Sequence, residues 1–436
     1  MTDDSTRESS GVTRRDVLKT ASLASIAAAL APSGVFAAAS ERIRVGLIGC
    51  GGRGTGAAVD CLTASPDVVI AALGDLFPDQ LESSLRELRQ KFPGERVTAT
   101  PETCFTGFEA YQKVLGAPVD LVILATPPFF RPGHLKAAIE AGKHVFTEKP
   151  VAVDPQGVKS VIATSELAAQ KRLAIVAGTQ RRHQAHYLEI VKRVRGGDLG
   201  EVVAGQCYWN MGALWVERAA ENWENRKAKG WSDMEWQIRN WLFTGWCSGD
   251  HIVEQHVHNL DVMNWALGSH PVKATGMGGR AARTEPQYGN IFDHFAVEFE
   301  YPNGVRVLSM CRQTAGAAEN VSERVVGSRG FSYTDSTDGY IKGAKAYEAK
   351  GSPNPYVEEH KDLLASIRAG RPLNEGRQVA ESTLTAIMGR MSAYTGRALS
   401  WDWVLNASKL DLSPAKLELG EAPTLEVPVP GKTALV

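Results

Sequence analysis

The stretch that decides the fold is Ile43–Gly54, which reads IRVGLIGCGGRG. An apolar run typical of a strand leads directly into a G-x-G-x-x-G loop, and a helical pattern begins near Thr55. A second apolar run, Val68–Leu73, is followed by Asp75. A strand, a glycine loop, a helix and a second strand ending in an acidic residue are typical of dinucleotide binding. The sequence therefore predicts a doubly wound Rossmann domain near the N-terminus.

The glycines of this loop suit the approach of a phosphate-bearing nucleotide. Gly49 permits the tight turn, and Gly51 lets the backbone approach a pyrophosphate at the start of a helix. Gly54 allows that helix to pack closely on the strand. The other predicted contacts of the loop are Cys50, Gly52 and Arg53. A purely structural glycine turn is the alternative interpretation.

Asp75 is the predicted partner of the adenosine ribose. A carboxylate at the end of the second strand binds ribose hydroxyls and repels a 2′-phosphate, which favours NAD. Arg53 could reach a 2′-phosphate, so NADP remains an alternative, as does a role for Asp75 as a cap of its strand. A later apolar run ends in Thr126 and Pro127. We expect these two residues to border the nicotinamide side, although they could simply end the strand.

Three domains follow from the change of pattern along the chain. Apolar runs alternate with helical stretches over residues 41–155, which predicts a parallel sheet with flanking helices. The segment Phe295–Met310 then has the alternation and the turn residues of a hairpin, which predicts antiparallel strands in a second domain over residues 156–400. Proline-spaced polar sequence predicts an extended arm over residues 401–436.

The N-terminal residues have the features of an export signal. Thr13–Lys19 contains the pair Arg14 and Arg15, and the uncharged stretch Thr20–Ala39 follows it. This pattern predicts a cleaved twin-arginine signal over residues 1–40 and a periplasmic or otherwise exported protein. Export of the folded chain would keep a tightly bound nucleotide in place. An uncleaved anchor and a chance arginine pair are the alternatives.

Composition excludes some classes of protein. A net charge of −1 argues against nucleic-acid binding, and after the signal no apolar stretch is long enough for a membrane span. The six cysteines include no C-x-x-C pair, so we expect mostly buried free thiols.

Three segments resemble the Gfo/Idh/MocA family of glucose-fructose oxidoreductase, inositol dehydrogenase and their relatives. They are Val45–Gly51, the AGKHVFTEKP segment Ala141–Pro150, and Ser248–Gly268. The resemblance covers roughly residues 41–400. It implies an N-terminal Rossmann domain, a C-terminal α/β domain with a large open, mainly antiparallel sheet, and a substrate cleft between them. It also implies a homo-oligomer that pairs through the open sheet.

The E-K-P motif places a candidate catalytic amine. By resemblance, Lys149 meets the reacting hydroxyl beside the nicotinamide, and Glu148 contacts a ribose or supports the structure. An ammonium group at a strand end can orient an alcohol or polarise the carbonyl that forms from it. Lys149 and Glu148 therefore join the predicted cofactor contacts. A surface lysine in a turn is the alternative.

A histidine supplies the candidate base. The family has D-x-x-x-H followed by N-x-D, and this chain has Glu254, His258 and then Asn259-Leu260-Asp261. A spacing of four residues predicts that Glu254 and His258 share a helical face, so the carboxylate could orient the imidazole. We predict that His258 accepts the proton of a sugar hydroxyl. A purely structural role of this histidine is the alternative. The nearby histidines lack a metal-binding spacing, so we expect no metal.

Predicted substrate contacts come from the second half of the chain: Arg181, Arg182, His256, Trp209 and Trp246. The two arginines could hold a polyhydroxylated or acidic substrate or form a solvated basic turn, and His256 could line the pocket or pack in the core. Seven of the ten tryptophans lie in the Trp-rich segment, residues 209–246. We interpret this segment as an insertion over the substrate mouth that stacks on a sugar, with a core or subunit contact as the alternative.

The leading functional hypothesis is an exported NAD(P)-dependent oxidoreductase that acts on CH–OH groups of a small carbohydrate or polyol. The alternative is an NAD-dependent glycoside hydrolase or lyase that oxidises its substrate transiently, eliminates the glycosidic oxygen and returns the hydride. Exported N-acetylgalactosaminidases with this cycle resemble the family. A non-catalytic sugar-binding protein would account for the tryptophans but not for Lys149 together with His258.

Overall fold

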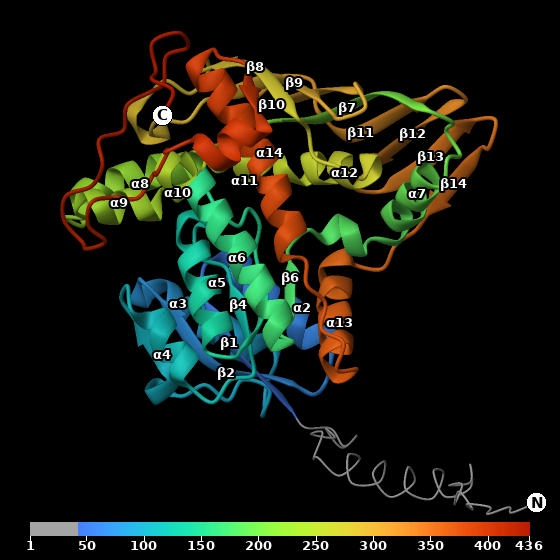
Figure 1. Cartoon of the computed structure of the whole chain (residues 1–436). Helices are drawn as coiled ribbons and strands as arrows, with labels where there is room; N and C mark the ends of the chain where they lie inside the picture. Colours follow the sequence, from blue (N-terminus) through green and yellow to red (C-terminus); the bar gives the residue numbers. More distant parts are fainter. Residues whose placement is uncertain (1–41) are drawn as a thin grey trace, which may run out of the picture. The chain divides into compact units, whose positions relative to one another are not determined.

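The computed structural model describes residues 42–436, so the predicted twin-arginine signal lies outside the described residues. Six parallel strands form the first sheet in the order β3-β2-β1-β4-β5-β6 (Figure 1). Their bounds are β1 Ile43–Ile48, β2 Val68–Asp75, β3 Cys104–Thr106, β4 Leu121–Leu124, β5 His144–Thr147 and β6 Ile175–Ala177. This order is that of a Rossmann sheet, which confirms the prediction from the glycine loop.

Helices cover this sheet because its strands are apolar on both sides. All four residues of β4 are fully buried, and two separate apolar clusters lie against the sheet. The helices are α2 Gly52–Ala64, α3 Pro78–Lys91, α4 Ala110–Gly116, α5 Arg131–Glu140 and α6 Pro155–Lys171. The sheet extends past the predicted boundary at residue 155, because the short strand β6 pairs with β5. The Rossmann sheet therefore ends at Ala177.

The second sheet has nine strands in the order β14-β13-β12-β11-β7-β10-β9-β8-β15. Only β7 and β10 pair in parallel; the other neighbours are antiparallel. The strands are β7 Val202–Met211, β8 Lys273–Gly279, β9 His294–Glu300, β10 Arg306–Gln313, β11 Asn320–Gly327, β12 Gly330–Asp335, β13 Asp338–Gly343, β14 Tyr347–Lys350 and β15 Leu399–Ser400. The predicted hairpin is β9–β10, and the mainly antiparallel sheet is confirmed.

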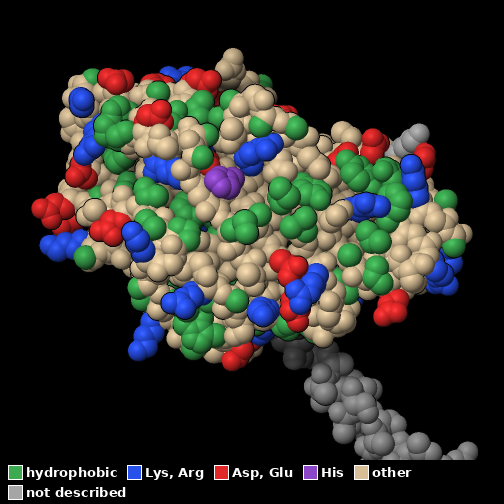
Figure 2. Space-filling view, turned by 90° about the horizontal axis from the view of Figure 1, so that it is seen from above, with side chains coloured by type: hydrophobic (Ala, Val, Ile, Leu, Met, Phe, Trp, Pro, Cys, Tyr) green, Lys and Arg blue, Asp and Glu red, His purple; other side chains and the backbone are tan. Residues whose placement is uncertain are grey.

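Helices pack on one face of the large sheet. Two of them are α12 Val257–Leu267, which contacts β7 and β11, and α14 Gly376–Thr395, which contacts β8 and β9. Figure 1 shows both helices between this sheet and the Rossmann domain. The opposite, outer face carries apolar side chains among charged ones (Figure 2).

The remaining elements connect the two sheets. The helices are α7 Ala185–Arg195, α8 Val216–Ala228, α9 Asp233–Arg239, α10 Gly245–Ser248, α11 His251–Glu254 and α13 Pro355–Arg368. Helix α13 packs on α2, although it is far away in the sequence. After a π-helical turn at Trp403–Ala407, the chain has no further helix or strand and runs past α9 (Figure 1).

The six cysteines are free, and five of them are buried, as the sequence predicted. Within residues 42–436, no helix has the length and apolar character that a membrane crossing requires.

Candidate active site

Glycines shape the turn between β1 and α2. Gly49 has a φ of +95°, and a Cβ there would lie 2.5 Å from the backbone nitrogen of Thr126. A Cβ on Gly54 would lie 1.9 Å from the carbonyl oxygen of Gly49. Gly51 has open space instead, and the start of α2 has no side-chain cap. The first backbone N–H groups of α2 are therefore available to an anion.

A cavity of about 680 Å³ lies in front of this turn. One wall belongs to the Rossmann domain and includes five predicted cofactor residues: Gly49, Gly51, Asp75, Thr126 and Pro127. The opposite wall comes from the Trp-rich segment. The cavity lies at the carboxyl ends of β1, β2 and β4, where open α/β sheets bind nucleotides. The volume of the cavity suits a dinucleotide such as NAD. The uncapped N-terminus of α2 and the open space beside Gly51 suit the approach of its pyrophosphate.

Asp75 combines a structural role with a place on the cavity wall. Its Oδ2 accepts the N–H of Cys50 at 2.6 Å, and its Oδ1 accepts that of Phe77 at 2.8 Å. Burial raises the pKa of Asp75, and these two N–H groups partly offset that rise. Because a carboxylate oxygen can accept a second hydrogen bond, Asp75 can also hold ribose hydroxyls.

Arg53 and Glu148 pair with each other instead of lining the cavity. The Nε of Arg53 lies 2.7 Å from Oε1 of Glu148, and its Nη2 lies 3.1 Å from Oδ2 of Asp60. The guanidinium also lies over the ring of Tyr356 at 5.1 Å. Glu148 is buried and needs this positive partner. Arg53 and Glu148 are thus engaged with each other, and their predicted contacts with a cofactor stay predictions.

The other loop residues contribute through the backbone. The side chain of Cys50 is buried in the Rossmann core, and only its N–H reaches Asp75. Gly52 begins α2, and neither it nor Gly54 lines the cavity.

Lys149 contacts Glu254 across the two domains. Lys149 follows β5 at the carboxyl end of the Rossmann sheet, and Glu254 ends α11. Nζ of Lys149 donates to the main-chain oxygen of Glu254 at 2.5 Å and lies 3.1 Å from its Oε1. Both side chains are largely buried. The chain therefore brings together two of the three predicted catalytic residues.

Glu254 and His258 do not share a helical face, which corrects the prediction from their spacing. Helix α11 ends at Glu254, α12 begins at Val257, and the chain turns between them at Gln255. The side chain of Gln255 is buried against Gln313 of β10, which explains why the helix breaks at this point. The carboxylate of Glu254 consequently contacts Lys149 and makes no hydrogen bond to the imidazole.

His258 is a buried, neutral imidazole in the first turn of α12. Burial, followed by the positive charge of Lys149, holds the pKa of His258 well below its usual value. The ring stacks on Trp209 with 5.7 Å between centroids and 21° between planes. A neutral imidazole can accept a proton, and the charge of Lys149 acts on it.

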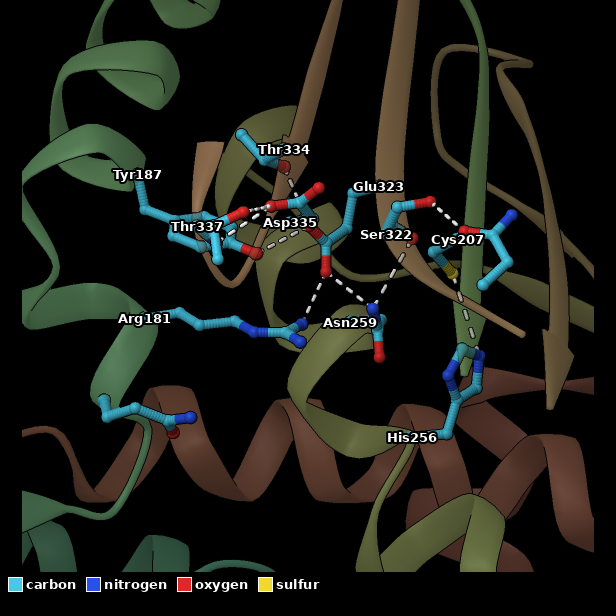
Figure 3. A network of polar contacts seen from close by, with 12 residues as sticks. Arg181, Tyr187, Cys207, His256, Asn259, Ser322, Glu323, Thr334, Asp335 and Thr337 are labelled. Atoms are coloured by element: carbon cyan, nitrogen blue, oxygen red, sulfur yellow. Dashed lines mark hydrogen bonds and ion pairs between the residues drawn. The ribbon is translucent and has the colours of Figure 1, made fainter. Parts of the chain in front are cut away.

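Arg181 belongs to a buried polar network on the large sheet (Figure 3). Its Nη1 lies 2.5 Å from Oε1 of Glu323, which also accepts from Nδ2 of Asn259 at 2.6 Å. The other carboxylate oxygen of Glu323 accepts from Tyr187 and Thr334. The guanidinium lies 5.5 Å from the ring centroid of Trp209, which places a fixed positive charge near His258.

Arg182 makes a two-pronged ion pair with Asp261. Its Nε and Nη2 lie 2.8 and 2.9 Å from the two carboxylate oxygens. Because Arg181 and Arg182 are both paired and largely buried, the alternative of a solvated basic turn is wrong. Their predicted contact with substrate stays a prediction.

Two other predicted substrate contacts lie in the protein core. His256 is fully buried, with Nε2 at 2.7 Å from Oγ of Ser309, and burial lowers its pKa to about 3. Trp246 is only 5% exposed, and its Nε1 donates to Gln237 at 2.6 Å. Both side chains are therefore packing residues in this structure, whereas Trp209 stacks on His258, the predicted catalytic base. Among the described residues, no group of three or more His, Cys, Asp and Glu side chains is placed to hold a metal.

The Trp-rich segment forms the second wall of the cavity. Its residues line the cavity opposite Gly49 and Asp75, and the cavity wall includes none of the predicted catalytic residues. That the segment covers the substrate mouth stays a prediction.

Arg131 is a buried residue that the sequence pattern did not single out. This side chain is 5% exposed and donates to the carbonyl oxygens of Thr126 at 2.9 Å and of Pro150 at 2.6 Å. It thereby fixes the loop after β4 against the loop that carries Lys149. The only signal in the sequence was weak: a charged residue at the start of a helical pattern with apolar positions.

The comparisons with known proteins agree with this geometry. A glycosyl hydrolase family 109 protein of Solibacter usitatus is 31% identical over 205 residues, which are 45% of each chain. Inositol 2-dehydrogenase 4 of Saccharopolyspora erythraea is 32% identical over 168 residues, 38% of this chain and 45% of that protein. Both matches thus span less than half of the relatives' own length.

A solved structure has the same fold over most of the chain. Scyllo-inositol dehydrogenase from Lactobacillus casei, with bound NAD(H) and scyllo-inositol, gives a TM-score of 0.62 at 18% identity. The superposition covers 82% of this chain and 98% of that one.

Two family models match consecutive parts of the sequence. Residues 43–192 match the model described as an oxidoreductase family with an NAD-binding Rossmann fold. Residues 187–332 match the GFO/IDH/MocA C-terminal domain. Together with the two sheets and the cavity between the glycine loop and the Trp-rich segment, these matches show that the chain belongs to the GFO/IDH/MocA family of NAD-binding oxidoreductases.

Proposed function

We propose that this protein is an NAD-dependent oxidoreductase that transfers hydride between NAD and a CH–OH group of a carbohydrate or polyol. The contact between Lys149 and Glu254 carries the proposal, because it brings an amine of the Rossmann domain to the helix pair that bears His258. The inositol dehydrogenases among the similar proteins support this substrate class. The carboxylate of Asp75 favours NAD over NADP.

The residues of the chain can divide the reaction between them. When NAD is bound, its nicotinamide ring takes the hydride from the substrate carbon. Lys149 orients the hydroxyl on that carbon and stabilises the developing carbonyl oxygen. His258, which is neutral, accepts the hydroxyl proton, so one proton and one hydride leave the alcohol. Glu254 holds the amine in place, and Trp209 supports the imidazole.

Absorbance of the reduced nicotinamide tests the proposal. The purified protein is loaded with NAD and offered a panel of sugars and polyols, with a His258→Gln variant as the control. We expect the band of the reduced ring to rise with at least one substrate and to stay flat in the variant. A protein that binds no nicotinamide nucleotide would contradict the proposal.

The second candidate is the hydrolytic or lyase cycle, which the match to a glycosyl hydrolase family 109 protein favours. The same groups would oxidise the sugar, and the acidified neighbouring C–H bond would then permit loss of the glycosidic oxygen before the hydride returns. Aryl glycosides distinguish the two functions. Release of the aglycone without lasting reduction of the cofactor supports the cycle, and stable reduction supports the dehydrogenase.

Export is part of the proposal. The arginine pair Arg14 and Arg15 before the uncharged stretch Thr20–Ala39 supports a twin-arginine signal and a periplasmic location. Fractionation of expressing cells, with an Arg14→Lys, Arg15→Lys double variant as the control, tests it. Wild-type protein that stays in the cytoplasm would contradict export.

We also propose a homo-oligomer that pairs through the outer face of the large sheet. Exposed apolar residues on neighbouring strands, Met277, Leu308 and Met310, support this interface.

A further inference from the structure

The Trp-rich segment supplies a second wall to the nucleotide cavity. Figure 1 shows α8 and α9 beside the Rossmann helices. The part of the segment that lines the cavity includes Trp215, Arg218, Asn222, Lys229, Trp231 and Arg239. Lys149, Glu254 and His258 do not line it, so a sugar at these residues would lie outside the part of the cavity that the segment covers.

Arg239 connects this wall to the Rossmann domain. Its Nη1 and Nη2 each lie 3.0 Å from an oxygen of Asp79, in the first turn of α3. Its Nε lies 2.9 Å from Glu235, and its guanidinium lies 3.8 Å from the ring centroid of Phe77. Although burial acts in the opposite direction, Arg239 holds the pKa of Asp79 below its usual range. A two-pronged pair that also stacks on a ring is stronger than an ordinary surface ion pair.

Apolar packing holds the segment in place behind this ion pair. Met234, Ile238 and Trp246 form one cluster with Phe77, and the ring centroid of Trp246 lies 5.1 Å from that of Phe129. The C-terminal arm adds partly buried residues to the cluster: Leu412, Ala422 and Leu425.

Hydrogen bonds to backbone oxygens of the arm connect it to α9. The N–H of Met234 donates to the oxygen of Gly420 at 3.1 Å, and Nε2 of Gln237 donates to the oxygen of Pro423 at 2.8 Å. At its other end the arm donates from the N–H of Leu412 to Oδ2 of Asp154, at 2.9 Å.

Two cations of the segment, Arg218 and Lys229, line the cavity, whose wall also includes Glu217 and Glu221. Arg218 lies over the ring of Trp215 at 5.5 Å. Burial lowers the pKa of Arg218, and the charge of Glu221 acts in the opposite direction. Within residues 42–436 neither cation has a salt bridge, and cations without one on a partly desolvated wall are suited to an anionic ligand such as a diphosphate.

We propose that the Trp-rich segment encloses the adenosine and diphosphate half of NAD, and that the ion pair of Arg239 with Asp79 keeps it closed. Arg239 is a positioning residue: it acts through the wall and does not touch the reacting atoms. NAD then remains bound through many turnovers: a CH–OH group of one sugar gives it a hydride, and the carbonyl group of the same or a second sugar takes the hydride back together with a proton from His258, while sugars exchange at the other side of the ring. This inference rests on the proposed function, because it assumes that NAD is the ligand of the cavity.

Release of NADH from the full-length protein tests the inference. The protein is loaded with NADH, excess NAD is added, and the loss of bound-cofactor fluorescence gives the dissociation rate. We expect Arg239→Gln and Asp79→Asn each to raise this rate about tenfold, and Arg239→Lys to fall in between. The double variant Arg239→Gln, Asp79→Asn should release NADH no faster than the faster single variant, because both changes break one pair.

Arg226→Gln is the matched control. It breaks an ion pair with Asp233 inside the same segment and leaves the Rossmann domain untouched, so its rate should equal that of the wild type. Melting temperatures of all variants separate release from unfolding. Wild-type NADH release faster than turnover, or Arg239→Gln and Asp79→Asn variants that release at the wild-type rate, would overturn the inference and leave the proposed function intact. Absence of NADH binding in the wild type would overturn both.

Discussion

At Lys149 a single ammonium group contacts both the carboxylate and the main-chain oxygen of Glu254. Lys149→Met keeps much of the side-chain volume but removes the charge that orients the substrate hydroxyl. We expect turnover to fall about a hundredfold or more, with little change in NADH binding, since Lys149 does not line the nucleotide cavity. Steady-state kinetics and NADH titration measure the two effects. A Lys149→Met variant with full turnover would remove the catalytic assignment.

The same substitution has a consequence for His258. Burial and then the charge of Lys149 lower the pKa of His258, so its neutral form persists to low pH. In Lys149→Met the second cause is gone, and the pKa of His258 should rise toward its usual value. The acidic limb of the residual kcat/KM profile should therefore move to higher pH. An acidic limb at the wild-type position would show that another group controls it.

His183 should make stability depend on pH. Burial alone would lower the pKa of His183, but hydrogen bonds and charges of Asp362 and Glu375 outweigh burial and raise it to about 9. Protonated His183, paired with the two carboxylates, stabilises the fold fully at pH values below about 6.5, the pKa of histidine in the unfolded chain. This contribution is lost as the pH rises through about 9, the pKa of His183 in the folded chain. His183→Asn should cost about 2 kcal/mol near pH 6 and much less near pH 10. Denaturant unfolding at both pH values checks this, and a constant difference would contradict it.

Single residues were predictable where a local motif fixes their place. Asp75 and Gly51 line the cavity because the strand, loop and helix of the motif fix the positions of both residues. Arg53 belongs to the same loop, yet it turns toward Glu148 and Tyr356, which are distant in sequence. Its partner is set by tertiary packing, which the motif does not contain.

At the scale of elements, the β1–α2 unit depends on one close approach. A methyl group on Gly54 would meet the carbonyl oxygen of Gly49 at 1.9 Å, so Gly54→Ala should force α2 away from β1 and weaken NADH binding at least tenfold. Gly56→Ala is the matched control in the same helix, because its Cβ would contact only the Arg53 side chain, at 3.6 Å. That variant should bind normally and unfold at a slightly higher temperature. Equal binding by the two variants would contradict this account of the turn.

Among the elements, the sequence predicted least well where helices end and where the Trp-rich segment lies. The spacing of Glu254 and His258 fits one helix, but the buried contact of Gln255 with Gln313 breaks it. The tryptophans marked an unusual segment, but their spacing does not show which wall of the cavity the segment forms. The segment contacts the Rossmann domain through Arg239 and Asp79, which are 160 positions apart, and no local sequence pattern shows such a pair.

At the scale of the whole molecule, the two sheets face the solvent differently. The Rossmann sheet has helices against both faces, while the large sheet has α12 and α14 on one face only. The resemblance of three short segments was enough to predict both sheets. It did not place the end of the first domain, because the pairing of the short strand β6 with β5 is a tertiary contact that the sequence pattern does not show.

The exposed face of the large sheet leads to a prediction about assembly. Met277 is 72% exposed, and the sheet register places it in one row with Ala296 and Met310. A second copy of the chain packed on this apolar row would remove the row from water, so we expect the protein to self-associate. Met310→Glu places a charge in the row and should lower the mass measured by sedimentation to that of one chain. Leu188→Glu, an equally exposed apolar site on α7, should leave the wild-type mass unchanged. A wild-type protein that sediments as a single chain, or equal effects of the two substitutions, would rule out this face as the interface.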